Sequence, residues 1–182
     1  DDQRVDEETE PRDILAEARE HAADENFGWE QKLYAKEIKG TPEKAKKALY
    51  FHELGEIQER RLEEIGRAGK AYGQAARLNP GFRSNLWAVR RILVRREKWA
   101  NVKKILDAEL KLATSEEERS DLLLEKGHLL EQHLEDAIGA LECYREAFEA
   151  NPQRVEALMA IERLHAGGGD LDALVEVCRK HA

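Results

Sequence analysis

Residues 71–81 read AYGQAARLNPG, and residues 143–153 read CYREAFEANPQ. In the first stretch Tyr72 is followed by an alanine three positions later and by Asn-Pro seven and eight positions later. The same spacing begins again at Tyr144. A pattern repeated at a fixed distance is the sequence signature of a repeat architecture. It therefore indicates the fold class of this chain more directly than its other features.

The register that relates Tyr72 to Tyr144 extends well beyond these two stretches. It continues without a gap on both sides of the Asn-Pro pairs, and conservative apolar pairs fill the positions between identical ones. The identical pairs include Gly55 with Gly127, Leu62 with Leu134, Ala68 with Ala140, Asn79 with Asn151, Leu86 with Leu158, Ala88 with Ala160 and Arg91 with Arg163. We therefore interpret the chain as an array of related structural units.

The spacing inside each unit is helical. Apolar or aromatic residues occur at positions 50, 51, 54, 57 and 62, close to a period of 3.6 residues. Ala68, Tyr72 and Ala75 share one face of a second helix, and Asn79-Pro80 ends that helix because the residue before a proline is pushed out of the α region. Each unit is thus two short antiparallel helices, which must stack on a neighbour to bury their apolar faces.

This arrangement resembles the tetratricopeptide repeat (TPR) family. The resemblance depends on a small Leu-Gly pair in the first helix, then alanine, an aromatic residue, alanine and a closing proline. These places are filled by Leu54-Gly55, Ala68, Tyr72, Ala75 and Pro80, and later by Gly127, Ala140, Tyr144, Ala147 and Pro152, with Lys126 in place of the leucine. The resemblance implies an all-α, right-handed superhelical solenoid of antiparallel helix pairs, whose first helices line a concave groove that binds peptides or partner helices.

The rest of the chain is assigned around these two repeats. Residues 83–119 form a divergent repeat without the glycine and proline, with Trp99 at the start of its second helix. We expect an acidic disordered segment over 1–11, a divergent helix pair over 12–47, and four TPR-like repeats over 48–82, 83–119, 120–154 and 155–182. This gives about ten helices, with Asp13 and Thr41 as caps of the helices near the N-terminus.

Composition narrows the classes of function. Charged residues make up 37% of the chain and the formal net charge is −8, which argues against nucleic acid as the main partner. No apolar run approaches the roughly 20 residues that cross a bilayer, so we expect no membrane association. Two cysteines are too few for a secreted disulfide scaffold, which favours a reducing, cytoplasmic location. We expect the chain to be part of a longer TPR protein.

The candidate binding residues lie on one stripe of the stretch FRSNLWAVRRILVRREKW, residues 82–99. Arg83, Trp87, Arg91 and Arg95 recur at every fourth position, on a different face from the buried leucines. Guanidinium groups beside an indole suit an acidic peptide with an aromatic or apolar anchor. The predicted groove is completed by other residues at first-helix positions, namely His52, Glu56, His128 and Met159.

A structural interpretation of the same stripe is also open. The arginines could pair with Glu56 and Glu59 on the preceding first helix, and Trp87 could pack between repeats; exposed pairs of this kind contribute only about 0–1 kcal/mol each. One TPR subtype binds chaperone carboxylates through lysines and asparagines, but the corresponding places here include His52, Glu56 and Leu124. We therefore do not expect chaperone-tail binding.

Nothing in the sequence predicts catalysis, a cofactor or a metal site. Gly167-Gly168-Gly169 lacks the lysine and the preceding strand of a phosphate loop, so we expect a helix stop with Asp170 capping the next helix. The six histidines form no pair with metal-ligand spacing. Cys143 and Cys178 are expected to be buried thiols that act as small apolar groups. Three glycines in one helix, Gly66, Gly69 and Gly73, suggest close helix approach between repeats.

Three kinds of function remain. The first is a non-catalytic scaffold that binds a protein or peptide in the groove. The alternative is a structural module that oligomerises through its ends, because the last segment offers Leu174, Val177 and other apolar residues that a further repeat or a second copy would cover. RNA binding, known for related helical-hairpin repeats, is disfavoured by the acidic balance.

Overall fold

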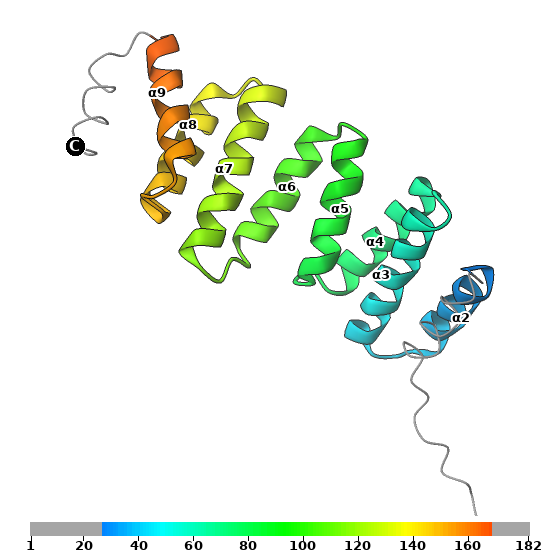
Figure 1. The fold of residues 1–182 in the computed structure, drawn as a ribbon. Coiled ribbons are helices and arrows are strands. Elements are labelled where there is room, and N and C mark those ends of the chain that lie inside the picture. Colours follow the sequence, from blue (N-terminus) through cyan, green and yellow to red (C-terminus); the bar gives the residue numbers. More distant parts are fainter. Residues whose placement is uncertain (1–26, 169–182) are drawn as a thin grey trace, which may run out of the picture. The chain divides into compact units, whose positions relative to one another are not determined.

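The computed structural model describes residues 27–168 and contains eight α-helices and no strand in that range (Figure 1). The all-α expectation is confirmed. The helices expected before residue 27 and after residue 168, together with the Asp13 and Asp170 caps and Cys178, lie outside the described residues. The chain divides into two compact units, residues 1–80 and 81–182, which we describe separately.

The described part of the first unit, residues 27–80, contains three helices, α2 (Phe27–Gly40), α3 (Lys44–Arg60) and α4 (Ile65–Leu78). Helix α3 packs against both α2 and α4. Its contact with α2 is a cluster of buried apolar residues that includes Leu33, Tyr34, Ile38 and Tyr50. Its contact with α4 is built on Tyr72, which is fully buried. The unit thus consists of the α3–α4 helix pair with α2 packed on α3.

Between residues 81 and 168 the second unit contains five helices, each of which packs on the next. They are α5 (Arg83–Arg95), α6 (Trp99–Leu110), α7 (Glu116–His133), α8 (Ala137–Ala150) and α9 (Val155–Gly168). Helix α6 begins at Trp99, as the sequence predicted. We call α3, α5, α7 and α9 the A helices and α4, α6 and α8 the B helices, in the order of the expected repeats. The core lies between A and B helices, and its buried members include Val102, Leu106, Leu130 and Tyr144.

The two Asn-Pro pairs end their helices in the same way. Asn79 follows α4 with φ −140° and ψ 89°, and Asn151 follows α8 with φ −143° and ψ 94°. In both cases the asparagine N–H donates to the alanine carbonyl four residues earlier, at 2.9 Å and 3.0 Å. The predicted stops are confirmed, because proline holds the preceding residue in extended geometry.

The expectation that Thr41 caps the next helix was wrong. Helix α3 begins at Lys44, and its N-cap is Glu43, which has an extended backbone and no side-chain capping hydrogen bond. The first helical hydrogen bond runs from Lys47 N–H to the Glu43 carbonyl, 2.9 Å. Thr41 N–H instead donates to the Glu37 carbonyl and so belongs to the end of α2.

Each of the three turns from an A helix to a B helix within residues 27–168 contains one residue in the left-handed region. These residues are glutamates in all three turns, with φ of 54° at Glu63, 53° at Glu97 and 53° at Glu135. The turn after α5 has the hydrogen bonds of a Schellman motif, because Glu97 N–H donates to the Val94 carbonyl and Lys98 N–H to the Leu93 carbonyl, both at 2.9 Å. In the other two turns the residue after the glutamate donates to a carbonyl six positions earlier, Glu64 to Gln58 and Asp136 to Leu130. The sequence does not predict this conformation, because glycine is the residue that usually adopts it.

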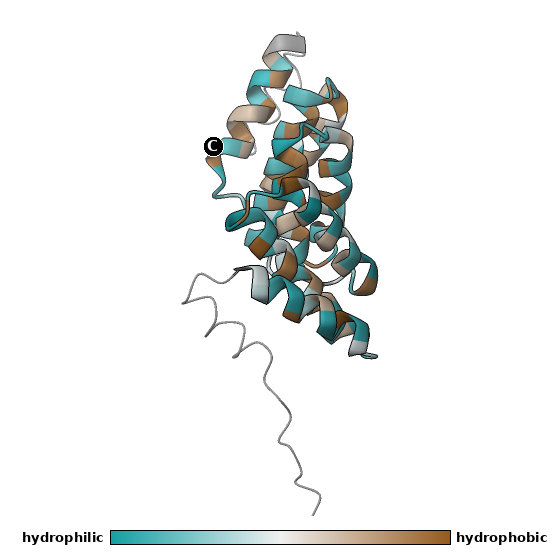
Figure 2. Cartoon of the chain, turned by 90° about the vertical axis from the view of Figure 1, so that its right-hand side faces the viewer, coloured by the Kyte–Doolittle hydropathy of each residue, from teal (hydrophilic) through white to brown (hydrophobic). Residues whose placement is uncertain are grey.

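Polar and apolar residues alternate around the helices. Figure 2 shows hydrophilic and hydrophobic residues interleaved along them, as expected for helices that bury one side and expose the other. Within residues 27–168, no helix combines the length and the apolar character needed to cross a bilayer.

Candidate binding surface

The A and B helices of two pairs are held together by a glycine against a tyrosine ring. An added Cβ at Gly55 would lie 2.5 Å from Tyr72 Cε1, and one at Gly127 would lie 2.4 Å from Tyr144 Cε1. Such distances are far below van der Waals contact, so only glycine permits this approach. The repeat register seen in the sequence therefore has a physical cause: each tyrosine ring occupies the space that the glycine lacks.

The same tyrosines carry a hydrogen bond back to the A helix. Tyr72 Oη lies 3.0 Å from Glu56 Oε1 and 2.9 Å from Glu59 Oε2, and Tyr144 Oη donates to Glu131 Oε2 at 2.8 Å. Glu131 is the counterpart of Glu59. Burial and the neighbouring carboxylates raise the pKa of both phenols, which therefore stay protonated as donors. This arrangement fixes the rotation of α3 against α4 and of α7 against α8, and so decides which residues of α3 and α7 face outward.

Trp87 is one residue that faces outward. Its side chain is 53% exposed on α5, while Leu86 and Ala88 on either side are buried. The guanidinium carbon of Arg91, one turn later, lies 5.0 Å from the centre of a Trp87 ring, which is cation–π geometry. The sequence prediction placed these two residues on one stripe, and the structure brings their side chains together.

Met159 holds the corresponding place on α9, in the register that relates Tyr72 to Tyr144. It is 62% exposed, and Val155, one turn earlier on the same helix, is also exposed. Leu124 holds this place on α7 and is half-buried against the apolar clusters of α7, α8 and α9. The first-helix position of Trp87 is thus apolar on all three A helices of the second unit, and strongly exposed on α5 and α9.

The next turn of these helices carries polar residues at the equivalent places. They are Arg91 on α5, His128 on α7 and Arg163 on α9. His128 is exposed and its ring contacts the edge of Tyr144, with centres 5.5 Å apart. Arg163 pairs with Glu131 through both of its terminal nitrogens, one of them at 2.8 Å. Arg95, a further turn along α5 from Arg91, is exposed.

The pairing of Arg163 parallels the structural interpretation of the stripe on α5. That interpretation concerned the arginines of residues 82–99, with Glu56 and Glu59 as partners. At the equivalent places of α9 and α7, Arg163 pairs with Glu131. Hydrogen bonds from Arg163 lower the pKa of the Glu131 carboxyl in spite of its burial, and the same contact raises the pKa of Arg163. Arg163 therefore links α9 to α7.

His52 and Glu56, the predicted groove residues of the first unit, take part in packing. His52 is only 8% exposed, and its ring centre lies 5.5 Å from that of Tyr72. Glu56 receives the Tyr72 hydroxyl contact and also pairs with Arg60, 2.6 Å away. Both residues support the α3–α4 contact, and His52 has little surface left for a partner.

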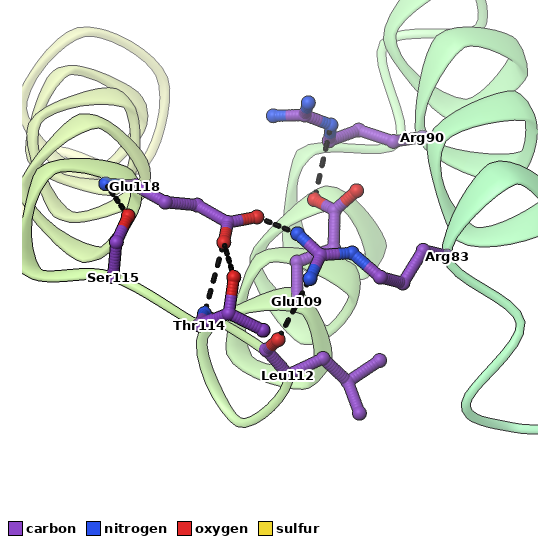
Figure 3. A network of polar contacts seen from close by, with 7 residues as sticks. All are labelled: Arg83, Arg90, Glu109, Leu112, Thr114, Ser115 and Glu118. Carbon is purple, nitrogen blue, oxygen red and sulfur yellow. Dashed lines mark hydrogen bonds and ion pairs between the residues drawn. The ribbon is translucent and has the colours of Figure 1, made fainter.

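Arg83 belongs to the predicted stripe, but its guanidinium group makes contacts within the chain (Figure 3). Its guanidinium donates to the Leu112 carbonyl at 3.0 Å and pairs with Glu118 at the start of α7. Glu118 also accepts hydrogen bonds from Thr114, while Ser115 caps α7 by accepting from the Glu118 N–H at 3.1 Å. Arg83 therefore joins α5 to the beginning of the next repeat.

Sequence reasoning missed Arg90 on α5, whose side chain is only 13% exposed. Its Nε lies 3.2 Å from Glu109 Oε2 on α6, and it also pairs with Glu125 on α7. Burial raises the pKa of Glu109, and the Arg90 charge opposes that shift. A regular spacing in the sequence could have indicated these ion pairs. Arg83 and Glu118 have the same separation along the chain as Arg90 and Glu125, and this separation is close to the length of one expected repeat.

Other sequence expectations can be checked at single residues. Cys143 is a buried free thiol whose pKa is raised by burial, as expected of a small apolar group. The expectation that Gly73 allows close helix approach was wrong. A Cβ added at Gly73 would meet no atom within 4 Å, so close packing does not explain this glycine. Residues 27–168 include no group of three or more His, Cys, Asp or Glu side chains that could hold a metal ion.

Comparison with solved structures agrees with the architecture. A tetratricopeptide repeat protein from Parabacteroides merdae ATCC 43184 matches with a TM-score of 0.63 and 15% identity, over 90% of this chain and 62% of that one. The chain has a TPR-like fold. Further matches are MamA 41-end from Desulfovibrio magneticus RS-1, with TM-score 0.57, 11% identity and coverage of 92% and 90%, and YrrB, with TM-score 0.54, 22% identity and coverage of 79% and 70%.

These identities are low, so the likeness concerns the fold alone. The YrrB structure is described as a TPR protein with an unusual peptide-binding site. No protein-family model and no curated protein matches the sequence. The expected TPR resemblance is confirmed at the level of architecture.

Proposed function

We propose that the chain is a non-catalytic protein-interaction scaffold that binds a peptide or a partner helix along the A helices of its second unit. The observation that supports this is the shared position of Trp87 and Met159, which are both large, apolar and more than half exposed. Burying one such side chain contributes about 1.5–3 kcal/mol, and tryptophan and arginine are enriched among residues that dominate binding energy.

The chemistry of the partner follows from the residues around this position. Trp87, Val155 and Met159 provide apolar contacts for an aromatic or aliphatic anchor. Arg91 and Arg95 add positive charge on α5 and favour carboxylates on the partner. An acidic peptide with an apolar anchor therefore fits this surface, in keeping with the YrrB likeness noted above.

A display experiment tests the proposal directly. A random-peptide library is selected on the wild-type chain, and the selected peptides are then measured against a Trp87→Ala, Met159→Ala double variant. We expect at least a tenfold loss of affinity, since about 1.4 kcal/mol corresponds to a factor of ten. Far-UV circular dichroism should be unchanged, because neither side chain is part of the core.

Ile138 provides the matched control. It is 75% exposed, lies on α8 rather than on an A helix, and its replacement removes a similar apolar area. The Ile138→Ala variant should bind the selected peptides as the wild type does. Equal binding by all three proteins, or equal loss in both variants, would contradict the proposed surface.

A further inference from the structure

The helices of the first unit carry a second feature, a concentration of lysines around the α2–α3 connection. We define the lysine cluster as Lys36 and Lys39 near the end of α2 and Lys44, Lys46 and Lys47 in the first turn of α3. Only the short segment 41–43 separates the two helices, so these side chains lie around one end of the helix pair. All are exposed except Lys47, which is half-exposed.

These lysines are not neutralised within the described part of the chain. None of the five has a carboxylate partner among residues 27–168, and only Lys46 makes a defined contact, with its Nζ 5.9 Å from the centre of the Tyr50 ring. The two carboxylates in the segment are Glu37 and Glu43, and Glu43 makes no capping hydrogen bond. Several basic residues of the second unit do have carboxylate partners, among them Arg83, Arg90, Arg119 and Lys126.

The position of Lys44, Lys46 and Lys47 is unfavourable for the isolated helix. The first turn of a helix carries partial positive charge, so it favours acidic side chains and disfavours lysines. Helix α7 follows the rule with Glu116, Glu117 and Glu118 in its first turn, whereas α3 has no acidic residue there. A group of like charges placed against the helix dipole lowers stability, and a bound anion would reverse that effect.

The overall charge of −8 does not oppose such a partner. Residues 1–26 contain 11 acidic and 3 basic residues, so they account for the whole net charge and residues 27–182 are neutral in sum. The segment 32–47 contains six lysines and two glutamates. The excess of acidic residues therefore comes from a part of the sequence outside α2 and α3.

We propose that the lysine cluster is a docking surface for an acidic segment of a partner protein. Charge complementarity supports an anionic partner, and the compactness of the cluster, confined to about one helical turn on each side of the connection, fits a short run of carboxylates. A nucleic acid is less suited, because the cluster is made of lysines without an exposed aromatic ring beside them for base stacking; Tyr50 is buried and Phe51 half-buried. This surface is independent of the Trp87–Met159 surface.

The test compares two triple variants of the 182-residue chain that change the net charge equally. The first is Lys36→Ala, Lys44→Ala, Lys47→Ala, which leaves Lys46 against Tyr50 and Lys39 at the favourable end of α2. The control is Lys98→Ala, Lys104→Ala, Lys111→Ala, three exposed lysines on and around α6. The probe is a fluorescein-labelled poly-glutamate peptide, measured by anisotropy at low ionic strength, where charge interactions are least screened.

We expect the cluster variant to lose at least tenfold in affinity for poly-glutamate and the control variant to stay within about twofold of wild type. The melting temperature of the cluster variant should stay the same or rise, because alanine replaces like charges near a helix start. A fall in its melting temperature would show that the lysines support the helices, and would overturn the proposal.

Two further arms separate the protein partner from other anions. An oligothymidylate of matched charge and vesicles that contain phosphatidylserine are titrated in parallel. Weaker binding of both than of poly-glutamate supports the proposal. If the oligothymidylate or the vesicles bind more tightly than poly-glutamate, and the cluster variant loses that binding, the surface would be assigned to nucleic acid or membrane instead. Equal loss in the two triple variants would mean that only total charge matters, which would also overturn the proposal.

Discussion

At the scale of single residues, the fold depends on two glycines that face two tyrosines. Gly55 and Gly127 each leave room for a buried phenol ring from the B helix, and the phenol oxygen returns a hydrogen bond to a glutamate one turn further along the A helix. Gly73 is also helical but has open space around its Cα. The two kinds of glycine should therefore respond in opposite ways to the same substitution.

We predict that Gly127→Ala lowers the free energy of unfolding by about 1–2 kcal/mol, because steric strain against Tyr144 exceeds the gain in helix propensity. Gly73→Ala, the matched control, should raise it by up to about 1 kcal/mol. Urea unfolding followed by circular dichroism measures both. A stabilised Gly127→Ala protein would mean that the Tyr144 ring moves aside at little cost.

At the scale of the elements, the turns between A and B helices share one strained residue. Glu63, Glu97 and Glu135 adopt left-handed backbone angles, which are sterically unfavourable for any residue with a Cβ. Hydrogen bonds of Asp136 hold the turn between α7 and α8. Its N–H donates to the Leu130 carbonyl at 2.9 Å, and its side chain caps α8 by accepting from Gly139 N–H. The surrounding hydrogen bonds compensate for the strain.

We predict that Glu135→Gly stabilises the chain by about 0.5–1 kcal/mol, since glycine adopts this conformation without a steric penalty. The control is Gln132→Gly, an exposed position in the last turn of α7, where glycine should cost up to about 1 kcal/mol. Thermal denaturation of the two variants beside the wild type would show shifts of opposite sign. If both variants melt earlier, the left-handed residue is not the source of strain.

At the scale of the whole molecule, charged pairs link successive repeats of the second unit. Arg83 and Arg90 reach from α5 to glutamates of α7, and Arg163 reaches from α9 back to Glu131. The Arg163–Glu131 pair is partly enclosed and includes the Tyr144 hydroxyl, so it differs from a pair on an open surface. Its effect on stability should depend on pH.

Glu131 has a pKa below its ordinary value in the folded chain, chiefly because of the hydrogen bonds from Arg163. Its contribution to stability is therefore present above the unfolded pKa of about 4.3 and is lost as pH falls through the lower folded pKa. We predict that Glu131→Gln destabilises the chain most at neutral pH and least at pH about 3. Melting curves across this range check the sign, with Glu146→Gln, in the exposed pair with Arg119, as a control of small effect.

The TPR-like architecture and both helix stops could be predicted from the sequence, because they depend on local rules. Spacing of apolar residues decides helix formation, proline restricts the residue before it, and the register that relates Tyr72 to Tyr144 shows which units are equivalent. Gly55 and Gly127 were identified in the same way. The sequence also places Trp87 on a different face from the buried leucines, but only the structure shows that its side chain is exposed.

Tertiary structure alone decided which charged and polar side chains are available. The sequence shows Arg83 and Arg90 on one helix, but their partners lie on or beside later helices, so only packing assigns the two arginines to structural ion pairs. The same holds for His52, which the ring of Tyr72 encloses, and for the left-handed glutamates, whose strain is balanced by hydrogen bonds across the turn. Helix formation is governed by near neighbours in the sequence, whereas the role of a side chain depends on what the folded chain brings beside it.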